Sequence, residues 1–446
     1  MILQAVVAAS YLGKEAERVQ ISDEARRDEL EKIHKYDFAE CVQKIGAFHG
    51  PGLQANIESL TKNGTWLPEL SIDIFTLPET VIPGLPDIGH SRHISSNYSA
   101  DSAIHLAREW LEDCLANHGR CGSGLRPGSL RSALPSRIID VTPLDQTGSV
   151  RVQEMAGQHA LYLCLSHCWG TPSRPLMSTT ANIRDRLSRI EWSELPKTFQ
   201  DAIGFVRLLG QQYLWIDSLC IIQDDYDDWA EQSAQMAQIY ENSYLTLAAA
   251  KARNSESGLY SSEELFQSTP FPVLDEHGAT HTAYFRKHVP HFFNTSDTKY
   301  RDCMFPLLSR AWVLQERLLP PRVLWFGPAE LTWEYCEKFL CECSPQVERA
   351  FQLSRKAFYA RSLHDPQGTS RADVWRYIVS SYSELDITNP KDRLLALQGI
   401  AHQLFHKNAP LKVISGLWEG DMFMDMLWRI SSRTERIDQK HTPSWS

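Results

Sequence analysis

Trp312 and Glu316 are the pair of residues with the clearest chemical potential in this sequence. They are four positions apart, so they share one face if the segment is helical. A carboxyl group beside an indole ring would lie in a partly dry pocket, where it can stabilise a cationic, sugar-like transition state. Spacing alone favours another interpretation, in which Glu316 is a surface residue that pairs with Arg317 or Arg322.

A second group of candidates follows two short apolar runs that are typical of buried strands. Ser166 and Trp169 come at the end of the first run, and Asp217 ends the second. Ligands of open parallel sheets bind beyond the carboxyl ends of the strands, so these side chains are expected at one edge of a sheet. The alternative is that Ser166 and Asp217 only cap turns or helices.

Cys114, His118 and Cys121 have a spacing that could supply three zinc ligands. The fourth ligand would be one of three later cysteines, Cys336, Cys341 or Cys343. Structural zinc sites usually draw their ligands from two closely spaced pairs, and no second pair is obvious here. We therefore expect buried thiols and no metal site, with zinc as the open alternative.

An acidic run and an adjacent histidine and cysteine are weaker candidates for chemistry. The run Asp224–Asp228 superficially resembles the aspartate-rich motif that binds magnesium diphosphate in terpene synthases. It precedes a predicted helix, and acidic side chains are favourable at a helix N-terminus without any metal. His167 and Cys168 are neighbours, which point to opposite faces of a strand and make a poor base–nucleophile couple.

The elements that would position these residues alternate between strand and helix. Short apolar runs predict strands at 161–166, 213–217 and 244–249. Apolar stripes at helical spacing predict helices at 199–209 and 229–240. This alternation predicts an α/β fold with a parallel sheet.

Three regions are expected along the chain. They are a helical and loop-rich arm at 1–98, a core domain at 99–335 and a mostly helical C-terminal region at 345–446. The core domain has its motifs at 160–330 and a polar insertion at about 251–300. The last residues, 443–446, carry no natural stop signal, so we expect the sequence to end early.

The composition is that of an ordinary globular protein. The 446 residues include 45 Lys+Arg and 55 Asp+Glu, and the resulting net charge of -10 disfavours binding to nucleic acid. No apolar run approaches the ~18 residues that span a membrane, and the N-terminus lacks the basic segment of a signal peptide. The ten cysteines lack the regular spacing of secreted proteins, so we expect free thiols and a cytoplasmic location.

Five segments resemble, in order and spacing, the motifs of the fungal heterokaryon incompatibility (HET) domain. They are Leu163–Gly170, Leu195–Ala202, Tyr213–Gln223, Asp228–Tyr240 and Arg310–Arg317, the last followed by Pro321-Arg322. The resemblance covers about 160–330, and the flanking segments Trp110–Cys114 and Asp392–Ala401 also resemble the family. We therefore expect the core domain at 99–335 to be a HET domain.

This resemblance implies a role and a fold. HET-domain proteins of filamentous fungi are best known for triggering programmed cell death when genetically different hyphae fuse. The domain is thought to be a distant relative of TIR domains, so the implied core is a parallel flavodoxin/TIR-like sheet with helical flanking regions. Some TIR domains cleave NAD at the nicotinamide–ribose bond with a glutamate in a Trp-x-x-x-Glu context, and Trp312 and Glu316 match that context.

The resemblance also implies roles for single residues. Glu316 would be the catalytic residue and would stabilise the positive charge that develops on the ribose. The ligand-binding residues would orient the dinucleotide (Ser166, Asp217), stack on its base (Trp169 or Trp312) and contact its phosphates (Arg310). No cofactor is implied, since NAD would be the substrate.

One position departs from the family pattern and leaves other functions open. The fourth motif often has an acidic residue four positions before its methionine, and this chain has Gln232 there. A catalytic role for that acid in the family would put the same activity in doubt here. The alternatives are a non-enzymatic module that signals by self-assembly or with another incompatibility protein, and a HET-like protein recruited as a biosynthetic enzyme for a small organic substrate.

Overall fold

The computed structural model describes residues 53–57, 70–85, 88–95, 100–121, 132–170, 175–261, 266–292, 298–344, 354–364, 371–406, 413–414, 417–419 and 422–427. The helical part predicted for the start of the N-terminal arm and the chain end at 443–446 lie outside these described residues.

The chain folds into two compact units. The first comprises Met1–Ser96, Glu263–Val289 and Glu342–Gln346, and the second comprises Asn97–Ser262, Pro290–Cys341 and Val347–Ser446. All five family-like segments and most of the predicted C-terminal region therefore belong to the second unit. The domain boundaries expected from the sequence stay predictions.

The first unit holds a four-stranded antiparallel sheet in the order β1-β2-β12-β11. Its strands are β1 (Leu53–Ile57), β2 (Leu70–Phe75), β11 (Thr269–Leu274) and β12 (Thr280–Lys287). Ile74, Phe271 and Phe285 belong to its apolar core. None of these strands is predicted from the sequence. In β11 the reason is clear, because Pro270 and Pro272 interrupt the strand pattern and only an edge strand tolerates them.

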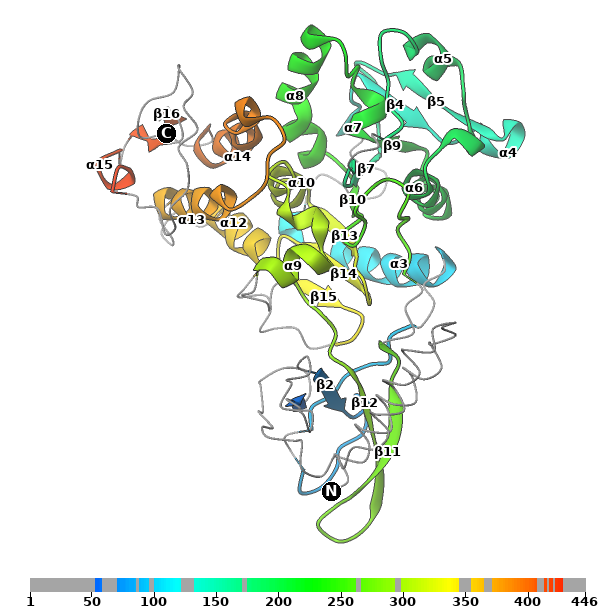
Figure 1. Ribbon diagram of the computed structural model, residues 1–446, viewed down its shortest axis with the longest axis vertical. Helices are drawn as coiled ribbons and strands as arrows, with labels where there is room; N and C mark the ends of the chain where they lie inside the picture. The colour runs from blue at the N-terminus through cyan, green and yellow to red at the C-terminus, as the bar shows by residue number, and fades with distance from the viewer. Residues whose placement is uncertain are drawn as a thin grey trace, which may run out of the picture. The chain divides into compact units, whose positions relative to one another are not determined.

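A nine-stranded mixed sheet is the main sheet of the second unit (Figure 1). In order across the sheet, its strands are β15 (Phe339–Cys341), β14 (Leu331–Tyr335), β13 (Arg322–Phe326), β10 (Leu245–Ala248), β7 (Leu163–Ser166), β9 (Tyr213–Trp215), β4 (Arg137–Asp140), β5 (Ser149–Glu154) and β8 (Ile190–Glu191). Two short antiparallel pairs are separate from it: β3 (Ser132–Ala133) with β6 (His159–Ala160), and β16 (Val413–Ile414) with β17 (Leu417–Trp418).

The strand directions correct the prediction of a parallel sheet. The pairings β13–β10, β10–β7 and β7–β9 are parallel. The pairings on both sides of this group, β15–β14, β14–β13, β9–β4, β4–β5 and β5–β8, are antiparallel. The fold is therefore mixed α/β. Apolar periodicity reports which strand faces are buried, whereas strand direction depends on long-range pairing. The central strands are therefore predictable from the sequence, but the mixed character of the sheet is not.

Helices connect and cover these strands (Figure 1). They are α3 (Ala100–Asn117), α4 (Leu144–Thr147), α5 (Ile183–Ser188), α6 (Lys197–Leu208), α7 (Asp217–Cys220), α8 (Tyr226–Glu241), α9 (Thr298–Met304), α10 (Val313–Leu318), α12 (Arg355–His364), α13 (Arg371–Ser383), α14 (Leu395–His406) and α15 (Met422–Asp425). Short 3-10 turns are η2 (Gly119–Cys121), η3 (Trp192–Glu194), η5 (Pro306–Ser309) and η6 (Pro390–Asp392). No helix in the described part of the chain is long and apolar enough to cross a membrane.

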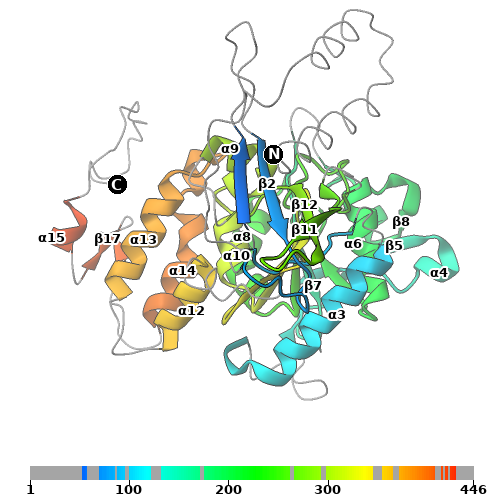
Figure 2. The same ribbon diagram turned by 90° about the horizontal axis from the view of Figure 1, so that it is seen from below.

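The C-terminal helices hold helix α10 in place, and Figure 2 shows α12, α13 and α14 gathered on one side of it. Lys356 of α12 is buried, and its ammonium group donates to the carbonyl oxygens of Arg317 and Pro320 at the end of α10. A cation is favourable there because the last carbonyl groups of a helix carry negative partial charge. Before the helix, the Ala311 N–H donates to the Asp386 carbonyl oxygen at 2.8 Å.

Gly399 permits the close contact of α14 with α8 and α10. A Cβ atom added at Gly399 would lie 2.2 Å from Ala237 Cβ on α8 and 2.3 Å from Gln315 Oε1 on α10. Both distances are far below van der Waals contact, so a methyl group would push α14 and α8 apart at Ala237 and would displace the Gln315 side chain.

Gly399→Ala is therefore expected to destabilise the protein, although alanine is the better helix former. The matched control is Gly204→Ala in α6, where no atom outside the backbone of the same helix lies within 4 Å of the added Cβ. Overpacking makes Gly399→Ala less stable than the control by about 1–3 kcal/mol. Thermal and denaturant unfolding measure the difference, and equal stability of the two variants would contradict the packing described.

Candidate functional site

The Glu316 carboxyl group is buried and faces the end of strand β7. All of α10 is buried, including the polar side chains of Gln315, Glu316 and Arg317. Ser166, the last residue of β7, donates a hydrogen bond from Oγ to Glu316 Oε2. Tyr240 of α8 hydrogen-bonds the same carboxyl group. One carboxyl group thus joins a strand and two helices that are distant in sequence.

Burial raises the pKa of Glu316 from its ordinary 4.5 to about 7, because the charged form loses its hydration. The negative charge of Asp217 raises the pKa further. The hydrogen bond from Ser166 and the positive charge of Arg310 act in the opposite direction. A carboxyl group with this pKa exchanges its proton near neutral pH, as acid–base and charge-stabilising groups of active sites do.

Asp217 is held by a hydrogen bond from a tryptophan of the first family-like segment. Trp169 Nε1 donates to Asp217 Oδ2 at 2.9 Å, and the Ser218 N–H donates to Asp217 Oδ1 at 2.7 Å. The second bond satisfies a backbone N–H in the first turn of α7, the short helix that begins at Asp217. Trp169 and Asp217 are both partly exposed, so ligands can reach them more easily than they can reach Ser166.

His167 lies beside Asp217 without forming an ion pair near neutral pH. Its Nδ1 is 3.8 Å from Asp217 Oδ1. Burial lowers the pKa of His167 to about 4, and the charge of Arg310 lowers it too, against the opposing effect of Asp217. The imidazole is therefore neutral at pH 7.

Arg310 and Trp312 precede α10, and both are partly exposed. Arg310 Nη1 donates to the His167 carbonyl oxygen at 2.8 Å, which ties the segment before α10 to the segment after β7. The Trp312 carbonyl oxygen accepts the Glu316 N–H at 3.4 Å. The bond between Trp312 and Glu316 is thus a backbone bond of the helix, and the two side chains are placed by α10 itself.

The structure brings most of the sequence-predicted residues to one place. Ser166, Asp217 and Arg310 act directly on the Glu316 carboxyl group, and Trp169 is linked to it through Asp217. Their assignment as catalytic or ligand-binding residues stays a prediction.

The interpretation of Glu316 as a surface residue is wrong. Its exposed fraction is 7 %. Arg317 instead forms a two-bond ion pair with Glu334 of β14, at 2.8 and 2.7 Å. Arg322 is buried as well, and its guanidinium group donates to Cys114 Sγ and to two backbone carbonyl oxygens. Residue spacing predicts a surface position for Glu316 only if α10 has an exposed face, and α10 is buried on all sides.

Tyr240 also belongs to this site, although its sequence position does not indicate this. Its ring packs edge-on against Trp215, with ring centres 5.6 Å apart, and its hydroxyl group lies 3.4 Å from the Leu165 carbonyl oxygen. In the sequence, Tyr240 is only one more position on the buried face of α8. No local signal connects it to Glu316, because their contact depends on how α8 and α10 pack.

Gln232 lies on the same helix as Tyr240 and is buried. Its Nε2 donates to Ser136 Oγ at 3.5 Å. The position that is often acidic in the family thus holds a neutral amide bonded to a hydroxyl group. Among the described residues, Glu316 and Asp217 are the carboxyl groups that the structure places beside Ser166 and Trp169.

The cysteines considered as zinc ligands are brought together in part. Hydrogen bonds link the Cys121 thiol to those of Cys114 and Cys336. Arg322 Nε donates to Cys114 Sγ at 3.2 Å. A guanidinium group at this distance stabilises a thiolate without a metal, and together with Cys121 it holds the pKa of Cys114 near 6.

Another group of side chains has the compactness of a metal site. The donor atoms of His291, Glu330 and Cys341 lie within 4.8 Å of one another. His291 Nε2 and Glu330 Oε1 are 2.7 Å apart, which is a hydrogen-bond distance. This buried pair is therefore explained by its own hydrogen bond.

The acidic run before α8 has partners within the protein. Asp225 caps α8 by accepting hydrogen bonds from two backbone N–H groups of its first turn. Asp224 accepts from Thr180, and Asp228 pairs with Arg137 at 2.5 Å. These contacts agree with the interpretation of the run as a helix N-terminus.

Comparison with known proteins identifies the domain that contains Glu316. Residues 162–316 match the family model described as heterokaryon incompatibility protein (HET). The chain carries a HET domain. The match begins just before β7 and ends at Glu316, so the HET domain includes both partners of the Ser166–Glu316 hydrogen bond. No curated protein and no solved structure matches the chain.

Ionisation of Glu316 is expected to cost the HET domain stability. The pKa of Glu316 is raised from 4.5 to about 7, so between these values the folded state binds more protons than the unfolded state. Stability therefore falls as the pH rises through this window, and the full cost of up to about 3 kcal/mol is present above pH 7. Glu316→Gln removes this cost.

The measurement is the free energy of unfolding of both proteins at pH 5 and pH 8. We expect Glu316→Gln to gain more over the wild type at pH 8 than at pH 5. Because its pKa is lowered in the folded state, His167 makes stability rise with pH in nearly the same pH range. His167 is present in both proteins, so this effect cancels in the comparison. An identical gain at the two pH values would mean that the Glu316 pKa is not raised.

Proposed function

We propose that this protein acts in fungal non-self recognition and programmed cell death, and that its HET domain cleaves NAD at the nicotinamide–ribose bond. The observation that supports cleavage best is the buried Glu316 carboxyl group, held by Ser166 at the carboxyl end of β7. Ligands of parallel strands bind at that end. The parallel strands β13, β10, β7 and β9 support a TIR-like core within the mixed sheet.

In this proposal Glu316 stabilises the transition state by its charge. When the bond between ribose C1′ and the nicotinamide nitrogen breaks, its electron pair moves to the nitrogen and neutralises the pyridinium. Positive charge develops on the ribose, where the Glu316 carboxylate stabilises it in a low-dielectric site. Water then adds to C1′ and releases a proton, which gives ADP-ribose and nicotinamide.

The remaining site residues would bind and orient NAD. Trp169 and Trp312 are partly exposed and have flat indole rings on which a base can stack. Arg310 carries the guanidinium group that suits a diphosphate. The Ser166 hydroxyl group fixes the direction of the Glu316 carboxylate, and Asp217 fixes Trp169 by its hydrogen bond.

We also propose that the protein acts in the cytoplasm, where the contents of fused hyphae mix. The cysteines of the described residues are free thiols, as is usual in a reducing compartment. Self-association or contact with another incompatibility protein would then act as the trigger of cleavage.

The test is the release of nicotinamide from NAD by the purified protein, measured by chromatography. Glu316→Gln is expected to lower kcat/KM about 10²–10³-fold, because the amide keeps the shape of the side chain but not its charge. The matched control is Glu231→Gln, the same chemical change at an exposed position of α8, which should leave the rate unchanged.

The pH dependence gives an independent check. The wild-type rate should rise as the pH increases through about 7, since the carboxylate form of Glu316 is the active one. Asp217→Asn should move this midpoint to lower pH, because it removes a negative charge that raises the pKa of Glu316.

Absence of nicotinamide release by the wild-type protein, even at concentrations where it self-associates, would exclude NAD cleavage. Expression in a fungal host then distinguishes the other functions. Cell death that persists in Glu316→Gln but is lost when surface substitutions block self-association would identify a non-enzymatic module. Absence of cell death as well would favour a recruited biosynthetic enzyme.

A further inference from the structure

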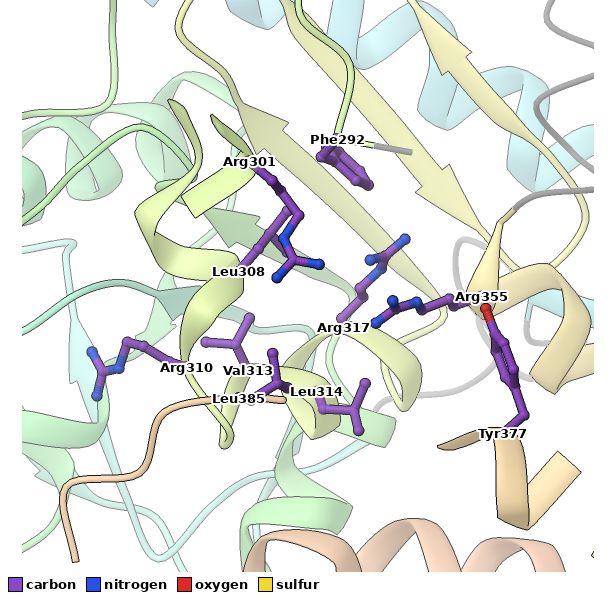
Figure 3. A pocket seen from close by; sticks show the side chains of 10 residues that line it. All are labelled: Phe292, Arg301, Leu308, Arg310, Val313, Leu314, Arg317, Arg355, Tyr377 and Leu385. Carbon is purple, nitrogen blue, oxygen red and sulfur yellow. The ribbon is translucent and has the colours of Figure 1, made fainter. Parts of the chain in front are cut away.

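A cavity of ≈ 210 Å³ with a strongly basic lining lies on α10 (Figure 3). Four arginines line it: Arg301 of α9, Arg310 before α10, Arg317 of α10 and Arg355 of α12. The other described side chains that line it, such as Phe292 and Tyr377, are apolar or aromatic, and no acidic residue is among these described residues. A concentration of like charge in so small a space requires an explanation.

Three of these guanidinium groups converge. Figure 3 shows Arg301, Arg317 and Arg355 pointing toward one space, whereas Arg310 points away from it. The Arg317 guanidinium group lies over the Phe292 ring, 4.9 Å from the ring centre, which fixes its orientation. The Tyr377 hydroxyl group hydrogen-bonds Arg355. The converging groups are therefore held in place by neighbours at the cavity wall.

Carboxylates balance the positive charges of the three converging arginines only in part. Arg317 is paired with the buried Glu334, at 2.8 and 2.7 Å. Among the described residues, Arg301 contacts Asp302 at 3.0 Å through Nε alone, so its terminal nitrogens can donate to another partner. Arg355 has no carboxylate within ion-pair distance among the described residues, and burial together with the charges of Arg317 and Arg301 lowers its pKa.

We propose that this cavity is a binding site for a phosphate-type oxyanion, either a free inorganic anion or the phosphate group of a small metabolite. An oxyanion would neutralise the excess positive charge and accept paired hydrogen bonds from the planar guanidinium groups of Arg301 and Arg355. The cavity is smaller than the ~300–1,000 Å³ typical of sites for whole drug-sized ligands, so it suits an anionic head group.

The site joins the HET domain to the sequence that follows it. Arg301 lies within the family match, whereas Arg317, Arg355 and Tyr377 lie after it. A bound oxyanion would therefore connect α9 to α10, α12 and α13. This inference does not rest on NAD cleavage, because among the described residues no hydrogen bond or ion pair joins the side chains of the three converging arginines to those of Glu316 or Ser166.

The first experiment measures the melting temperature of the full chain in inorganic diphosphate, at an ionic strength held constant with sodium chloride. The wild-type melting temperature should rise with diphosphate concentration, as expected for a ligand of the folded state. Arg355→Gln should lose most of this rise and bind diphosphate about tenfold or more weakly by calorimetry, since it removes a charged hydrogen-bond donor. Without diphosphate it should be at least as stable as the wild type, because a repulsive charge is gone.

The matched control is Arg184→Gln, which removes the same charge from an exposed position of α5 and should keep the full response to diphosphate. Arg301→Gln is a second test variant, in case Arg355→Gln does not fold, and it should also lose the response. Glu316→Gln should retain it, which separates this site from the proposed active site. Comparison of inorganic phosphate, diphosphate and ribose 5-phosphate then tells a free anion from an organic phosphate.

Two results would overturn the proposal. One is a wild-type response to diphosphate no larger than the response to sodium chloride of equal ionic strength. The other is an undiminished response in both Arg355→Gln and Arg301→Gln.

Discussion

The burial of helix α10 is the constraint on which the second unit depends. Its sequence puts Gln315, Glu316 and Arg317 side by side where water does not reach them. Each side chain needs a partner, because a buried polar group without one costs about 1–3 kcal/mol. The partners come from three directions: a backbone carbonyl oxygen of α14, Ser166 of β7 and Glu334 of β14. These three contacts fix the position of α10 relative to the sheet and the C-terminal helices.

The same constraint explains why the chain after the family match is part of the structure that positions Glu316. The match ends at Glu316, but the last turn of α10 is capped by Lys356, and the segment before α10 is bonded to Asp386. Gly399 allows α14 to lie directly on α10. Without these residues, α10 would expose apolar and polar side chains that the sheet alone does not cover. The C-terminal helices therefore help to position Glu316, the last residue of the family match.

The sequence could predict the parts of the fold that are encoded locally. The strand that ends at Ser166, the strand just before Asp217 and the helix that contains Tyr240 have clear periodicity, and all are present. Strand direction and the first-unit sheet could not be predicted, because both depend on pairing between distant segments. The same holds for the site. The residue types were recognisable, but the partners of Glu316 and Arg317 follow from tertiary packing. Spacing alone suggested that Glu316 pairs with Arg317 or Arg322, which is wrong.

Arg310 connects the two chemically distinctive sides of α10. It lines the arginine cavity, donates to the His167 carbonyl oxygen and lowers the pKa of Glu316 by its positive charge. Opposing effects set the protonation equilibrium of Glu316. Burial and Asp217 favour its neutral form, whereas Ser166 and Arg310 favour the carboxylate. The Arg310 guanidinium group points away from the space that Arg301, Arg317 and Arg355 share (Figure 3), so it acts on Glu316 as a charge of the protein itself and not as part of the proposed oxyanion site.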